Sequence, residues 1–181
     1  IYGPMLAAEV LAGDGGSGFL ATKRPAGDIL ADFKTGGIHL EPTSDVATVA
    51  ACGTLKNIYA LGLGVLDGIQ AGTNAKAAMT VRMAAELAAV LGKLQLDRSL
   101  AYSQCGLGDL LATGWGSTSY NHHIGIEIGG GETDGLSGEG LNSLMEIPSV
   151  IDIANFPILS SLHHIIVNKA PAEQFRDLIN K

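Results

Sequence analysis

A lysine stands in the middle of an apolar stretch, residues 51–67 (ACGTLKNIYALGLGVLD), and is the first candidate for chemistry. The stretch has no continuous polar face, so the helix that it predicts should be buried. A lysine is almost never fully buried unless it is paired. Two interpretations of Lys56 are open. Its ammonium reaches the surface along an apolar stem, or burial disfavours the charged form and allows proton exchange near neutral pH.

Two further polar residues begin apolar turns. Asp109 follows two glycines in Cys105-Gly-Leu-Gly-Asp109. We favour a simple capping role for it, and the alternative is a carboxylate that reaches into a cleft. Ser119 precedes a predicted helix over residues 120–128 and should cap it. The N-terminus of such a helix readily binds an anion.

The charge distribution restricts the partners. The net charge of −7 argues against nucleic acid as a partner. Between Arg98 and Lys169 there is no Lys or Arg, so an anionic ligand there must rely on histidines, backbone amides or a lysine from elsewhere. The pairs at 122–123 and 163–164 do not predict a metal site, because adjacent residues on a helix point in different directions.

One glycine motif is misleading. Gly13, Gly15 and Gly18 match the spacing G-x-G-x-x-G. A dinucleotide-binding loop must follow a strand and begin a helix, whereas these glycines follow a helical stretch and lead into a strand. A flexible turn is therefore the better interpretation.

Composition indicates a globular protein in a reducing compartment. Of its 181 residues, 46% are hydrophobic and 16% charged, which is too apolar for disorder. No uninterrupted apolar run is long enough for a transmembrane helix. Cys52 and Cys105 suggest no disulfide framework, so we expect a cytoplasmic location. The first residues include neither an initiator Met nor a signal-peptide pattern, so we expect that the chain was cut from a longer one.

Residues 1–45 show an α/β pattern. The expected elements are a helix over 7–11, a strand over 18–22, a helix over 26–33 and a strand over 37–41 that ends before Pro42. Two strands make no stable sheet alone, so this segment should need partners outside the chain or a second copy.

From residue 48 onward the pattern is helical. The expected helices cover 48–70, 75–94, 98–104, 120–128, 141–154, 158–168 and 172–179. Asn74 and Asp97 should cap the second and third of these helices. The prediction is a mainly α protein, in which an all-helical domain over 46–181 follows the α/β segment over 1–45.

Six short motifs follow one another in a recognisable order. They are Cys52-Gly-Thr-Leu-Lys-Asn57, Gly64-Val-Leu-Asp-Gly68, Gly72-Thr-Asn-Ala-Lys-Ala-Ala78, Gly106-Leu-Gly-Asp-Leu-Leu-Ala-Thr113, Ser119-Tyr-Asn121 and Glu139-Gly140. Together they resemble the substrate domain of NAD(P)-dependent glycerol-3-phosphate dehydrogenase. The resemblance implies a multi-helical dehydrogenase C-terminal domain, of the 6-phosphogluconate dehydrogenase C-terminal type. The tail of a Rossmann domain, without its glycine fingerprint, would precede it.

The resemblance also implies an enzyme. It would transfer hydride reversibly between dihydroxyacetone phosphate and sn-glycerol 3-phosphate, with NAD or NADP as cofactor. Lys56 would be the proton donor and acceptor. Asp109 would hold the substrate hydroxyl or orient Lys56, and Asn57 would help to fix the lysine.

Five other residues would bind rather than react, by the same resemblance. Ser119 and Asn121 would receive the substrate phosphate, and Gly3 would lie against the substrate. Ala7 and Glu139 would touch the cofactor.

The chain departs from the family around the phosphate. The family pattern there is typically Ser-Arg-Asn-Arg-Arg, whereas this chain has Ser119-Tyr-Asn-His-His123 and so loses the bidentate partners of a phosphate. Met5 also stands where the family usually has Ser or Thr. We expect His122 and His123 to replace the arginines in part, so that phosphate binding weakens as the pH rises. The alternative function is a catalytically degenerate homologue or fragment that acts as a helical binding or dimerisation module. Whether the chain forms a homodimer stays an open question.

Overall fold

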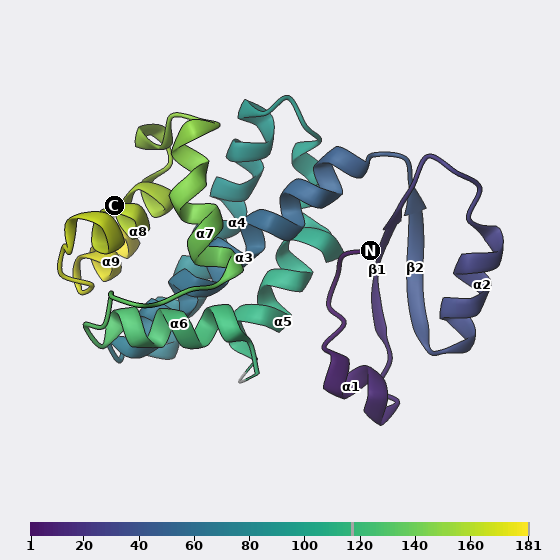
Figure 1. Cartoon of the computed structure of the whole chain (residues 1–181), viewed down its shortest axis with the longest axis horizontal. Helices are drawn as coiled ribbons and strands as arrows, with labels where there is room; N and C mark the ends of the chain where they lie inside the picture. The colour runs from purple at the N-terminus through teal and green to yellow at the C-terminus, as the bar shows by residue number, and fades with distance from the viewer. Residues whose placement is uncertain (117, 181) are drawn as a thin grey trace.

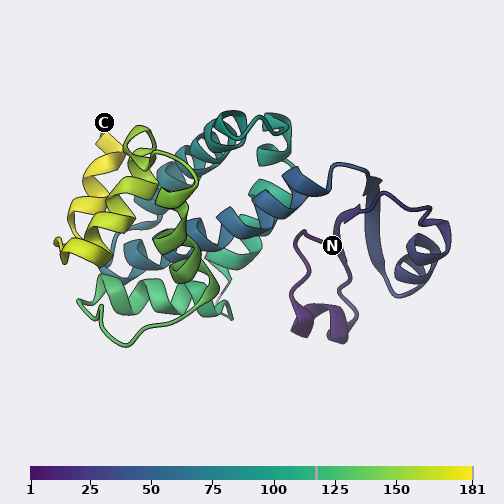
Figure 2. The ribbon, with the colours of Figure 1, turned by 45° about the horizontal axis from the view of Figure 1, so that its top comes forward.

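The structure, a computed structural model, describes residues 1–116 and 118–180 and consists of an α/β lobe and a helical lobe (Figures 1 and 2). The α/β lobe contains α1 (Ala7–Ala12), β1 (Gly16–Ala21), α2 (Gly27–Thr35) and β2 (Ile38–Thr43). The longer helices of the helical lobe are α3 (Val46–Gly68), α4 (Thr73–Lys93), α5 (Asp109–Trp115), α6 (Tyr120–Gly129), α7 (Glu139–Glu146), α8 (Pro157–Asn168) and α9 (Gln174–Asp177). Short turns join them: η1 (Arg98–Tyr102), η2 (Gln104–Gly108), η3 (Ile147–Ser149), η4 (Ile153–Asn155) and η5 (Leu178–Asn180). The predicted domain end at residue 181 lies outside the described residues.

The α/β lobe has almost no core of its own. Strands β1 and β2 are parallel, α2 joins them, and Tyr2 adds an antiparallel bridge to Phe19. Of residues 1–45, Gly3, Gly18 and Leu20 alone are buried. A two-stranded sheet with so few buried residues is only marginally stable by itself. That this segment needs a partner stays a prediction.

Strand β2 does not end where the sequence indicated. The strand was predicted to stop before Pro42, but it continues through Pro42 to Thr43, with Pro42 opposite Leu20 of β1. The prediction was wrong because β2 is an edge strand, where the missing N–H of a proline interrupts no ladder on the open side.

The helical lobe is built around α3, which crosses it from end to end (Figure 1). Its side chains Ile58, Leu61, Leu63 and Leu66 have no exposed surface. Asp45 begins the helix by accepting a hydrogen bond from the backbone N–H of Thr48. Among the described residues α3 is the one helix long and apolar enough to cross a membrane, but 72% of its most apolar window is buried inside the protein, as in a core helix.

Glycines bring the backbones of α3 and α6 together. A Cβ on Gly64 would overlap the carbonyl oxygen of His122, and a Cβ on Gly125 would overlap that of Leu61. One turn further along, Gly68 and Gly129 meet in the same way. The two helices therefore make backbone-to-backbone contact along α6, which leaves no room for side chains between them.

Several predicted helix boundaries differ from the observed ones, and two of these differences involve a cap and a proline. Gly72, not Asn74, precedes α4, and no side chain caps this helix. The expected helix over 141–154 ends at Glu146, because Pro148 has no N–H to continue the hydrogen-bond ladder and a 3-10 turn follows. The prediction that Asp97 caps the next element is confirmed, since its carboxylate accepts from Ser99 N at 2.9 Å.

A buried carboxylate from α4 takes the place of an N-cap on α8. Glu86 accepts hydrogen bonds from the backbone N–H groups of Ile158 (2.8 Å) and Leu159 (2.9 Å). Burial raises the pKa of Glu86, and the two backbone donors oppose this shift. The first turn of α8 is thus attached to α4 through the side chain of Glu86.

The glycine contact gives a testable stability prediction. Gly64→Ala should lower the free energy of unfolding by about 3 kcal/mol, because the new methyl group meets backbone atoms that cannot rotate away. The midpoint of thermal unfolding, followed by circular dichroism, should fall by roughly 6–12 °C.

Gly27→Ala is the matched control, because a Cβ there meets nothing within 4 Å. This variant should unfold no earlier than the wild type. Equal midpoints for the Gly64 and Gly27 variants would contradict the proposed tight contact.

Candidate active site

Lys56 is paired across the interface between α3 and α5. Its Nζ donates to Asp109 Oδ1 at 2.9 Å and to Thr113 Oγ1 at 3.1 Å. Asp109 and Thr113 are four residues apart on α5, so they share one face, and the threonine hydroxyl lies 3.3 Å from the same Oδ1. The side chains of Lys56 and Asp109 are only 16% and 8% exposed. Pairing with a carboxylate, rather than extension to the surface, therefore explains how this helix accommodates a lysine.

Asp109 does not cap a helix, so the prediction that we favoured from the residues alone was wrong. The π-helical turn η2 leads directly into α5, and Gly108 is itself helical (φ −59°, ψ −51°). The first N–H groups of α5 therefore continue an existing helix and need no capping side chain. Thr113 was missed, although its position four residues after Asp109 was a usable signal.

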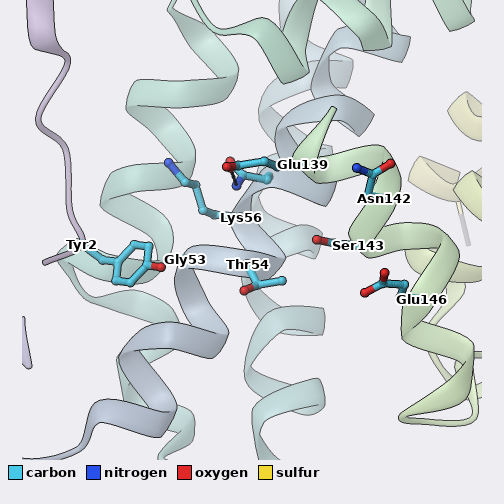
Figure 3. Close-up of a pocket in the computed structure, with 9 residues that line it drawn as sticks. Tyr2, Gly53, Thr54, Lys56, Glu139, Asn142, Ser143 and Glu146 are labelled. Carbon is cyan, nitrogen blue, oxygen red and sulfur yellow. Dashed lines mark hydrogen bonds between the residues drawn. The ribbon is translucent and has the colours of Figure 1, made fainter. Parts of the chain in front are cut away.

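Lys56 lines a cavity of about 400 Å³ between α3, α7 and the first residues of the chain (Figure 3). Tyr2, Asn57 and Glu139 also line this cavity. An ammonium has three N–H donors, and two are taken by Asp109 and Thr113. Within the described residues the third donor has no protein partner, so it is available to a ligand.

Asn57 and Asn121 both attach the start of α7 to the rest of the site. Asn57 Nδ2 donates to Glu139 Oε2 at 3.1 Å, and Asn121 Oδ1 accepts from Gly140 N at 2.9 Å. The hydrogen bond of the Asn57 side chain thus goes to Glu139 and not to Lys56. Of the predicted residues, Lys56, Asn57 and Glu139 line one cavity. Asn121 does not line this cavity but binds Gly140, the residue after Glu139.

The other predicted residues lie further apart. Ser119 caps α6, as predicted, by accepting from His122 N at 3.3 Å. Gly3 is buried against Ser17 and Gly18, and Ala7 is an exposed residue at the start of α1. Neither Gly3 nor Ala7 lines the cavity that contains Lys56.

A second ionic cluster, which we did not predict, lies behind the N-terminus of α6. Asp67 Oδ2 accepts from Lys76 Nζ at 2.6 Å and lies 2.7 Å from His122 Nε2. The Lys76 ammonium also lies 5.1 Å from the ring centroid of Trp115. This cluster joins the end of α3, the start of α4, the end of α5 and the first turn of α6. Among the described residues no group of three or more His, Cys, Asp or Glu side chains is arranged to hold a metal ion.

His122 is held by this cluster. The residue is only 6% exposed, and its Nδ1 is buried without a hydrogen-bond partner. Burial lowers the pKa of His122, Asp67 opposes this shift, and the charges of Lys76 and His123 add to it. Since the ring of His122 is bound to Asp67, it cannot replace an arginine on a phosphate at Ser119, and the expectation for His122 is corrected. The expectation for His123 stays a prediction.

The lowered pKa of His122 predicts a pH dependence of stability. A histidine whose folded pKa lies below 6.5 binds its proton less tightly in the folded than in the unfolded protein. Its contribution to stability is therefore complete above 6.5 and is lost as the pH falls. His122→Gln keeps an N–H for Asp67 but does not titrate. Urea denaturation should show the wild type losing more stability than this variant between about pH 8 and about pH 5. A constant difference between the two proteins would contradict the assignment.

Comparisons with known proteins agree on one family. The sequence profile described as NAD-dependent glycerol-3-phosphate dehydrogenase C-terminus matches residues 45–177. A glycerol-3-phosphate dehydrogenase [NAD(P)+] of Pelodictyon phaeoclathratiforme is 30% identical over 96% of this chain and 56% of its own length. That of Synechococcus sp. (strain JA-2-3B'a(2-13)) is 35% identical over 73% of this chain and 42% of its own length. The chain spans about half the length of the curated relatives that it matches.

Solved structures confirm the predicted fold class. Glycerol-3-phosphate dehydrogenase from Coxiella burnetii superposes with a TM-score of 0.87 at 25% identity, over 99% of this chain and 59% of that one. The Plasmodium falciparum enzyme has a TM-score of 0.82 at 18% identity, over 97% and 54%. The mainly helical architecture with a short parallel sheet is therefore that of this group of structures.

Proposed function

Because this chain belongs to the NAD-dependent glycerol-3-phosphate dehydrogenase family, we propose that it carries the substrate site of such an enzyme. The reaction would be reversible hydride transfer between dihydroxyacetone phosphate and sn-glycerol 3-phosphate. The observation that carries the proposal is the paired ammonium of Lys56, which has one donor left for a ligand at the wall of a cavity.

Lys56 is the proposed proton donor. When hydride arrives at a carbonyl carbon, negative charge develops on the oxygen, and a donor within hydrogen-bond reach lowers the barrier. The Lys56 ammonium can donate that proton, while Asp109 and Thr113 fix the direction of its remaining N–H. In the opposite direction the neutral amine accepts the proton of the substrate hydroxyl.

The residues present fit the reactive end of a nicotinamide cofactor. The cavity at Lys56 has a volume of about 400 Å³, which is within the range of small-molecule sites. Bound NAD(P)H would supply the hydride. Glu139, fixed by Asn57, and the exposed Ala7 are the residues proposed to touch it. Gly3 is proposed to lie against the substrate.

Several related predictions stay proposals. The segment 1–45 would complete a nucleotide-binding domain, and residues 46–181 would form the substrate domain. Ser119 and Asn121 would receive the substrate phosphate. A cytoplasmic location and a homodimer are consistent with this function but do not follow from it.

The alternative is a degenerate homologue that binds a partner but does not catalyse. The observation in its favour is that no Lys or Arg lies between Arg98 and Lys169, the segment that contains Ser119. The kinetic experiment on Lys56 separates the two functions.

Lys56→Met should abolish most of the activity. In the complete protein that carries this chain, kcat for dihydroxyacetone phosphate should fall by about a thousandfold, because the proton donor is lost. NADH or NADPH oxidation, followed by absorbance, measures this. Lys169→Met is the control, because Lys169 is half exposed and pairs with Asp134 on the surface. A wild-type protein without activity, or a Lys56 variant with full activity, would exclude the proposed role.

Tyr120→Arg should strengthen phosphate binding. Tyr120 is 66% exposed in the first turn of α6, beside Ser119, where a guanidinium could reach a phosphate. One additional charge-assisted hydrogen bond should lower the KM for dihydroxyacetone phosphate about tenfold. Tyr120→Gln, which adds no charge, should change it little. An unchanged KM in the arginine variant would mean that the phosphate does not lie at this end of α6.

A further inference from the structure

Two free thiols meet directly beneath the proposed reaction site. Cys52 on α3 and Cys105 on η2 are both fully buried. The Cys52 Sγ lies 3.9 Å and the Cys105 Sγ 4.0 Å from the same carbonyl oxygen, that of Leu100. The two thiols also interact with each other. Both sulfurs thus contact one carbonyl oxygen, and a movement of η2 toward α3 would bring them together.

The thiol pair repeats the spacing of the Lys56–Asp109 pair. Cys52 precedes Lys56 by four residues, and Cys105 precedes Asp109 by four residues. On α3, residues four apart lie one above the other. The π-helical turn η2 leads from Cys105 directly into α5 and Asp109. The two sulfurs therefore connect the same two segments as the Lys56–Asp109 ion pair, one turn earlier. Any change in the distance between these segments at the thiols is passed to the ion pair.

The two thiols are chemically unequal. Interaction with Cys52 lowers the pKa of Cys105 to about 7, and Ser103 Oγ, 3.3 Å from the Cys105 sulfur, acts in the same direction. Interaction with Cys105 and burial raise the pKa of Cys52. A thiolate is the nucleophilic form, so Cys105 is the thiol prepared to react first.

We propose that Cys52 and Cys105 are a modification site, at which a small hydroperoxide forms an intramolecular disulfide. The Cys105 thiolate attacks the peroxide oxygen, the O–O bond breaks, and Cys105 becomes a sulfenic acid. The hydroxide that leaves takes up the proton that the Cys105 thiol released, which gives water. The Cys52 sulfur then attacks the Cys105 sulfur and displaces hydroxide, which takes up the Cys52 proton and leaves as water. Two thiols and one hydrogen peroxide thus give one disulfide and two water molecules.

The surrounding structure admits only a small oxidant, and the turn η2 allows the shift toward α3 that disulfide formation needs. Full burial excludes bulky disulfides, whereas hydrogen peroxide is close to water in size. Cys105 belongs to the π-helical turn η2, a wide and uncommon helical form that includes Gly106 and Gly108. A disulfide requires a sulfur–sulfur distance of about 2 Å, so its formation draws η2 toward α3. Given the proposed function, this shift displaces Asp109 against Lys56 and lowers activity.

The first experiment tests the modification and does not depend on any activity. The folded chain is treated with hydrogen peroxide, quenched with an alkylating reagent and analysed by intact mass and by tryptic peptides. The expected result is a loss of about 2 Da, no alkylated cysteine and a linked peptide pair containing Cys52 and Cys105. Dithiothreitol should restore both thiols. Cys52→Ser and Cys105→Ser should each prevent the loss of 2 Da.

Three outcomes would overturn the modification site. They are sulfinic acid on Cys105 without a link, disulfides between chains, and oxidation in urea-unfolded protein only. Ser103→Ala tests the proposed order of events, because loss of the neighbouring hydroxyl should slow the oxidation.

The link to Lys56 has a separate readout in the complete protein. Peroxide should lower NADH or NADPH oxidation in the wild type, reversibly with dithiothreitol, and should not lower it in Cys52→Ser. A disulfide that forms without loss of activity would leave the modification site in place and exclude its influence on Lys56. If the complete protein has no activity, the proposed function fails, but the mass measurement still decides the modification.

Discussion

The contact between the backbones of α3 and α6 is the constraint on which the rest of the site depends. Gly64 and Gly68 on α3 face Gly125 and Gly129 on α6 without intervening side chains. The first turn of α6 therefore lies beside Gly64, in the last third of α3. The start of α7 is fixed in the same way, because a Cβ on Gly140 would overlap the carbonyl oxygen of Asn57. The backbone contact between Gly140 and Asn57 therefore sets the distance between α3 and α7, the two helices whose side chains line most of the cavity.

The elements and the central lysine were predictable because they leave local signals. An apolar run, a helix cap at Ser119 and the motifs around Lys56 are all contained in short stretches of sequence. The partners of those residues were harder to predict. Asp109 could be assigned to Lys56 only through the family resemblance, since capping and pairing look alike in sequence. Thr113 left one local signal, its position four residues after Asp109. That this helix face meets Lys56, and that Asp67 meets His122, depends on contacts across more than fifty residues, which no local pattern encodes.

Each cation at the centre of the helical lobe has its own carboxylate. Lys56 pairs with Asp109, and Lys76 pairs with Asp67, which it shares with His122. Such pairing allows charges to be buried, but it also reduces the positive potential that an anionic ligand would meet. A phosphate at the start of α6 would therefore depend on hydroxyl, amide and backbone N–H groups more than on net charge. Such a phosphate site differs from one built on arginine, because a guanidinium donates hydrogen bonds to two phosphate oxygens at once.

Trp115 gives the protein its own optical reporter. It is the single tryptophan of the chain and the last residue of α5, the helix that begins with Asp109. Its indole N–H donates to Thr80 Oγ1 at 3.2 Å, and its ring lies under the Lys76 ammonium. Trp115 is already 42% exposed, and any motion that separates α5 from α4 would break this hydrogen bond and release the ring from the cation. The fluorescence of an unlabelled sample therefore reports directly on the packing of the helix that holds Asp109.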